Sequence, residues 1–151
     1  MLRPERLVLR DGPGARVLLV SSSPTDVSRS DVLLRHVSSL LVGRGHVVDH
    51  LVLRDRPVVA DSLRQLVLAD GVVVTAPVQT TDPGLLETWL DLVPDNGFAG
   101  KLALPLAVDK ARSDDLRPVL TALGARLGPP DLGRAVELFL HNLADRRKDA
   151  A

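Results

Sequence analysis

The sequence predicts an α/β protein built on a doubly wound parallel sheet, because two kinds of segment alternate along the chain. Short apolar runs rich in Val and Leu, such as residues 17–20 and 72–75, are typical of strands. These runs show no polar/apolar alternation, which indicates burial on both faces of a sheet. Longer segments with apolar residues at helical spacing separate them. Right-handed crossovers between parallel strands then place helices on both faces.

The first half of the chain contains three expected strands and two helices. Residues 16–22 form a buried strand, and residues 47–53, with several polar positions, suit an edge strand. Between them Ser30 caps a helix to about residue 42. Asp61 opens a short helix, and residues 72–75 form the third strand.

The second half follows the same logic, since a capping residue precedes each apolar helical pattern. We expect a helix opened by Asp82 and Pro83, a strand at residues 101–108, a helix capped by Ser113, a short or weak fifth strand at 125–127, and a last helix capped by Asp131.

Length and composition predict one domain, residues 1–151, with residues 1–14 as a peripheral lead-in and 144–151 as a frayed tail. Nineteen basic residues balance nineteen acidic ones, which argues against nucleic-acid and anionic-membrane partners. The chain has no Cys, and its four His residues show no metal-binding spacing. We find no signal-peptide core or apolar run of membrane-spanning length and expect a cytoplasmic protein, bacterial by its Arg-rich, Lys-poor usage.

The loop at residues 21–30 reads Ser-Ser-Ser-Pro-Thr-Asp-Val-Ser-Arg-Ser and joins the first strand to the first helix. Its hydroxyls, backbone N–H groups and one Arg converge on the positive end of a helix dipole, an arrangement that binds phosphate. Because the glycine patterns of dinucleotide and P-loop sites are absent, the loop favours a flavin mononucleotide phosphate. A Ser-rich loop that only caps the helix is the alternative.

Further motifs follow this loop in a characteristic order. Residues 69–79 combine an Ala-Asp-Gly strand with a Thr-Ala-Pro-Val loop, and residues 84–94 continue as a Leu-rich helix ending in Pro. With residues 98–107 and 116–125, the pattern covers about residues 16–126. It resembles the NADPH-dependent FMN reductase family, especially the reductases that supply alkanesulfonate monooxygenases. The resemblance implies a three-layer, flavodoxin-like fold with strand order 2-1-3-4-5.

The resemblance also implies FMN and NAD(P)H as cofactor and substrate, with their contacts in three loops. Phosphate contacts would come from Ser21, Ser23, Thr25, Ser28, Arg29 and Ser30. Flavin-ring contacts would come from Pro77, Val78, Gln79 and Thr80, with Asp109 in the third loop. No catalytic acid or base is expected, because the cofactors carry the hydride chemistry.

Two departures from the family pattern leave the function open. Gln79 stands where the family has a flavin-contacting Tyr, and residues 108–112 replace a longer loop that contains glycines. The favoured function is an NAD(P)H-dependent FMN reductase that assembles as a homodimer or homotetramer, with the helix at residues 84–93 as a candidate dimer face. One alternative is a non-catalytic member that serves as partner or scaffold, in a heteromer with a paralogous subunit. Another is a binding protein for a different phosphorylated ligand.

Overall fold

The computed structural model describes residues 14–23, 29–76, 84–107, 110–128 and 132–150, and the predictions that fall elsewhere lie outside the described residues. Its core is a five-stranded parallel sheet in the order β2-β1-β3-β4-β5, which confirms the predicted topology. The strands are β1 (Arg16–Ser21), β2 (Val47–Val52), β3 (Gly71–Ala76), β4 (Leu102–Ala107) and the two-residue β5 (Arg126–Leu127).

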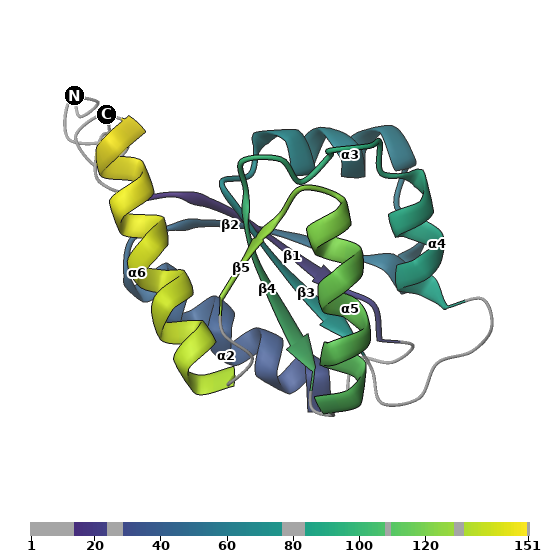
Figure 1. Cartoon of the computed structure of the whole chain (residues 1–151), viewed down its shortest axis with the longest axis horizontal. Coiled ribbons are helices and arrows are strands. Elements are labelled where there is room, and N and C mark those ends of the chain that lie inside the picture. The colour runs from purple at the N-terminus through teal and green to yellow at the C-terminus, as the bar shows by residue number, and fades with distance from the viewer. Residues whose placement is uncertain (1–13, 24–28, 77–83, 108–109, 129–131, 151) are drawn as a thin grey trace, which may run out of the picture.

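Helices cover both faces of this sheet and make three layers (Figure 1). The helical segments are α2 (Arg29–Gly43), a 3-10 turn η1 (Leu53–Asp55), α3 (Val59–Leu68), α4 (Leu85–Leu92), α5 (Lys110–Ala122) and α6 (Leu132–Ala150). Side chains of β1 alternate between two hydrophobic clusters, because successive strand residues point to opposite faces. Val17 and Leu19 pack with residues of α2 and α6, whereas Leu18 and Val20 pack with residues of α3, α4 and α5.

Polar contacts at the amino-terminal edge of the sheet fix how the strands begin. The Asp70 carboxylate accepts a hydrogen bond from the Arg16 backbone N–H at 2.9 Å, and the Asp70 carbonyl accepts one from Leu102 N–H at 3.2 Å. Asp70 therefore ties β1 and β4 to the start of β3. Nearby, the buried Lys101 ammonium donates to the carbonyls of Val67 and Ala69, at the carboxyl end of α3. A cation there satisfies helix-end carbonyls and complements the helix dipole.

Helix starts differ from the predictions at several points. α2 begins at Arg29, so Ser30 lies in its first turn, and α3 is preceded by Val58, so Asp61 also lies inside its helix. α4 starts after Gly84 and not at Asp82. A Cβ at residue 84 would meet the carboxylate end of the exposed Glu87 side chain, which can move aside, so this contact does not by itself require glycine.

The carboxyl-terminal third also contains more helix than predicted. α5 begins at Lys110, so Ser113, which was expected to cap it, lies within the helix. α6 continues to Ala150, so the segment predicted as a frayed tail belongs to this helix up to residue 150, and its fraying stays a prediction. Ala, Arg and Lys dominate these last residues, and all three are strong helix formers.

Candidate functional site

The candidate site lies at the carboxyl edge of the sheet, where ligands bind in doubly wound folds. β1, β3 and β4 end there at Ser21, Ala76 and Ala107. Four predicted contact residues are described: Ser21, Ser23, Arg29 and Ser30. The others lie outside the described residues: Thr25, Ser28, Pro77, Val78, Gln79, Thr80 and Asp109.

Ser21 is bonded within the protein. Its hydroxyl donates to Asp31 Oδ1 at 2.7 Å, and Arg54 Nη1 lies 3.3 Å from Asp31 Oδ2. One buried carboxylate therefore joins the end of β1, the first turn of α2 and the turn η1 that follows β2. Since a hydroxyl has a single proton, Ser21 cannot donate to Asp31 and to a phosphate at once.

Ser22 anchors the start of the same loop to β3. Its backbone N–H donates to Thr75 Oγ1 at 3.0 Å, and its hydroxyl donates to the Thr75 carbonyl. Thr75 Oγ1 also lies 3.3 Å from the Val20 carbonyl. All of these groups are buried, so the loop leaves the sheet from a fixed position.

Ser23 is the last described residue before the segment 24–28, and Ser30 is the second described residue after it; both are buried. Arg29, the first residue of α2, is exposed. The first turn of a helix carries backbone N–H groups without intrahelical acceptors and the positive end of the dipole. Hydroxyl and guanidinium donors beside such a helix end are suited to an oxyanion.

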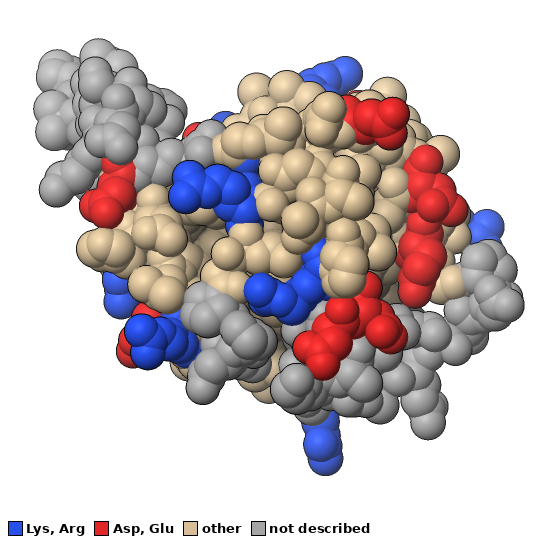
Figure 2. All heavy atoms as spheres, in the orientation of Figure 1, with Lys and Arg blue, Asp and Glu red and all other residues tan. Residues whose placement is uncertain are grey.

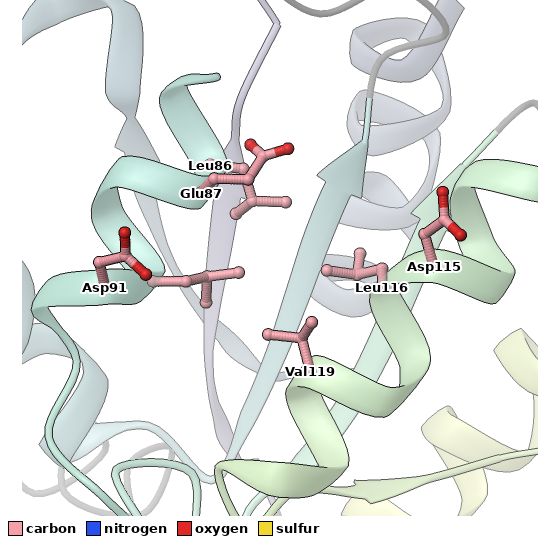
Figure 3. Close-up of a pocket in the computed structure, with 7 residues that line it drawn as sticks. Leu86, Glu87, Asp91, Asp115, Leu116 and Val119 are labelled. Carbon is pink, nitrogen blue, oxygen red and sulfur yellow. The ribbon is translucent and has the colours of Figure 1, made fainter. Parts of the chain in front are cut away.

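A groove lies between α4 and α5, on the face of the sheet opposite to α2 and α6 (Figure 3). It has a volume of about 260 Å³, and its apolar lining is Leu86, Leu90, Leu116 and Val119. Carboxylates of Glu87, Asp91 and Asp115 stand at its rim, and Figure 2 shows acidic side chains gathered over these two helices. The groove therefore combines an apolar floor with an acidic border.

Trp89 is a core residue and not a stacking platform. Its indole Nε1 donates to Ser62 Oγ at 3.0 Å, and its ring meets Phe98 edge-on with centroids 6.4 Å apart. Leu86, Trp89 and Leu90 of α4 are buried within the chain, whereas Leu92 is 48% exposed. Most of the apolar face expected to serve a dimer is thus covered by the chain's own core.

The sequence prediction missed the residues that support the loop. Asp31 directly follows the predicted contact Ser30, and Arg54 and Thr75 come from distant segments. Hydrophobic patterns give no signal for these residues, because their roles depend on long-range contacts. Asp31 and Arg54 are 23 residues apart in the sequence, and Ser22 and Thr75 are 53 apart.

The comparisons with known proteins agree with this geometry. The sequence pattern of NADPH-dependent FMN reductases matches residues 15–132. This chain belongs to the NADPH-dependent FMN reductase family. It is 35% identical over 134 residues to an FMN reductase (NADPH) of Escherichia coli (strain K12), an alignment covering 74% of this chain and 68% of that protein. It is 37% identical over 135 residues to an FMN reductase (NADPH) of Pseudomonas putida, covering 73% and 66%.

The chain thus spans about two thirds of the length of these two relatives. Among solved structures, an NADH:FMN oxidoreductase in its apo form has a TM-score of 0.66 at 24% identity, covering 90% of this chain and 89% of that one. Oxidised flavodoxin 1 from Bacillus cereus has a TM-score of 0.56 at 19% identity, covering 89% and 98%. At such identities these structures support the flavodoxin-like fold.

The family and fold predictions are therefore confirmed. The relatives support flavin reduction with FMN and NAD(P)H, and they do not favour the non-catalytic alternative. The individual contact residues stay predictions. Among the described helices, none is long and apolar enough to cross a membrane.

Proposed function

We propose that this chain is an NAD(P)H-dependent FMN reductase that holds the FMN phosphate at the start of α2. The observation that carries the proposal is the pair of buried hydroxyl residues, Ser23 and Ser30, on either side of the loop at the carboxyl edge of the sheet. Exposed Arg29 adds a cation at the helix end. This donor set fits a phosphate, which binds best to several converging N–H, O–H and guanidinium groups.

In this proposal the loop residues have two different tasks. Ser23, Arg29 and Ser30, with Thr25 and Ser28 of the loop, would contact phosphate. Ser21 would act by holding Asp31, because its only hydroxyl proton is donated there. Rigid support of this kind lowers the entropy lost when the ligand is bound.

The flavin, when bound, would accept a hydride at N5 from the reduced nicotinamide. The chain's own contribution is to bind and orient both ligands at the sheet edge. Backbone N–H groups of Val78, Gln79 and Thr80 would bond the flavin ring carbonyls, with Pro77 in contact with the ring and Asp109 beside the ring edge. Since the cofactors would supply the hydride chemistry, no acid or base from the protein would be required for it.

Assembly and location are part of the proposal. We propose a homodimer or homotetramer, with a heteromer containing a paralogous subunit as the alternative, in the cytoplasm. The α4–α5 groove, where Leu116 is buried and Val119 is 43% exposed, is the surface we assign to a subunit contact. Replacement of Val119 by Glu would place a further charge beside the acidic rim and should lower the mass measured by light scattering. An unchanged mass would exclude this face.

The experiment that tests the function is a titration of the purified protein with FMN, followed by addition of NADPH without oxygen. Binding at micromolar FMN and bleaching of the flavin absorbance would establish a reductase. Binding without bleaching would contradict the catalytic part of the proposal and favour a carrier or partner role. If FMN does not bind, the phosphate assignment is wrong.

A further inference from the structure

The Asp31 carboxylate lies at the amino end of α2, where the proposed function also places the negatively charged FMN phosphate. Asp31 is the third residue of α2, and its side chain is only 7% exposed, so solvent screens it weakly. A carboxylate in the first turn stabilises a helix, because it faces the positive end of the dipole. The same carboxylate opposes the binding of a phosphate at that helix end.

Arg54 is the residue that offsets this charge. It reaches Asp31 from η1, across the end of the sheet, with Nη1 3.3 Å from Oδ2. The other carboxylate oxygen accepts the neutral Ser21 hydroxyl at 2.7 Å. Of Ser21 and Arg54 only Arg54 brings a positive charge, so its removal would take that charge away from the Asp31 carboxylate.

We propose that Arg54 determines the selectivity of this site for phosphorylated flavin, by neutralising Asp31 so that a phosphate can share the amino end of α2. The inference rests on the proposed function. Arg54 acts through Asp31 and need not touch the ligand: it sets the charge that the phosphate meets at the helix end. It would influence FMN, which carries a phosphate, and leave riboflavin, which has none, largely unaffected.

The test compares two dissociation constants for each variant, one for riboflavin and one for FMN, and takes their ratio as the contribution of the phosphate. Arg54→Met keeps the length of the side chain and removes its charge. We expect the ratio to fall roughly tenfold, because the phosphate then meets the Asp31 carboxylate without the Arg54 charge beside it, in weakly screened surroundings. Riboflavin affinity should change by less than about twofold.

Two further variants separate charge from structure. Asp31→Asn keeps an acceptor for Ser21 and removes the negative charge, so the ratio should rise above that of the wild type. In the double variant Asp31→Asn/Arg54→Met both charges are gone, and the ratio should return to within about threefold of the wild-type value. A pair that only stabilised the fold would lower the affinity for both flavins and would show no such restoration.

The matched control is Arg16→Met, which removes an Arg from the exposed Arg16–Asp49 pair at the opposite end of β1. It should leave the ratio unchanged. The inference is overturned if Arg54→Met keeps the wild-type ratio, or if Asp31→Asn lowers it. A wild-type protein that binds neither flavin would overturn the proposed function itself, and one that binds riboflavin as tightly as FMN would overturn the phosphate assignment.

Discussion

Thr75 offers a direct test of how the loop is anchored, since one hydroxyl serves two buried backbone groups. Replacement by Val keeps the shape of the side chain and removes only the polar atom. In the native chain Thr75 Oγ1 accepts from Ser22 N–H at 3.0 Å and lies 3.3 Å from the Val20 carbonyl. Thr75 is fully buried and Ser22 is 3% exposed, so water does not reach the N–H once its acceptor is lost.

The expected loss of stability follows from these two contacts. A buried N–H left without an acceptor costs about 1–3 kcal/mol, and the weaker bond to Val20 contributes about 0.5–1 kcal/mol. We therefore expect Thr75→Val to lower the free energy of unfolding by about 1.5–4 kcal/mol. At a typical urea dependence of about 2 kcal/mol per molar, the unfolding midpoint should fall by roughly 0.8–2 M.

Urea unfolding in the absence of flavin measures this quantity, because a bound ligand would add stability of its own. The matched control is Thr88→Val in α4, where an exposed hydroxyl donates to the Gly84 carbonyl of the same helix at 2.9 Å. We expect that substitution to change stability by less than about 0.5 kcal/mol. If Thr75→Val matched Thr88→Val, the buried contacts would not anchor the loop.

Three further predictions concern other parts of the chain. Lys101→Met should lower the free energy of unfolding by about 2–3 kcal/mol in urea, because two carbonyls at the end of α3 lose a charged donor. Burial lowers the pKa of His46, whose Nδ1 accepts the Ala15 N–H, so the unfolded chain binds more protons than the folded one just below pH 6.5. Stability should therefore fall as the pH falls below about 6.5, and His46→Asn should remove that part of the slope in calorimetric scans at several pH values. Arg29→Ala should weaken FMN binding by about 1.5–3 kcal/mol in a fluorescence titration, whereas exposed Arg44→Ala, beyond the other end of α2, should leave it unchanged.

The sequence was sufficient to predict the sheet, because its signal is local. β1 and β3 are apolar runs buried on both faces, and such runs identify central strands without knowledge of their neighbours. Helix starts were predicted less well, since Asp61 and Ser113 are capping residues by type but lie inside their helices. Capping preferences amount to about 1 kcal/mol, and tertiary packing overrides them.

The candidate site shows the limit of such reasoning at single residues. Ser21, Ser22 and Ser23 are identical in type and adjacent in sequence, so composition alone cannot separate their roles. The structure separates two of them by direction: the Ser21 hydroxyl meets Asp31 of α2, and the Ser22 hydroxyl meets Thr75 of β3. The directions of the Ser21 and Ser22 hydroxyls depend on the residue at which β1 ends, because successive residues at the end of a strand point to opposite faces of the sheet.

This division has a consequence for how the loop can change. Substitutions at Ser21 would disturb the ends of β1 and α2, and substitutions at Ser22 would disturb the ends of β1 and β3. Their effects on flavin binding should therefore be accompanied by losses of stability. A change at exposed Arg29 has no such structural cost, and its effect should be confined to the phosphate. Arg54 lies between these cases, because it is partly exposed yet paired with a buried charge. Its substitution should lower stability, because it takes a positive charge away from a buried carboxylate, and should also lower selectivity when FMN is compared with riboflavin.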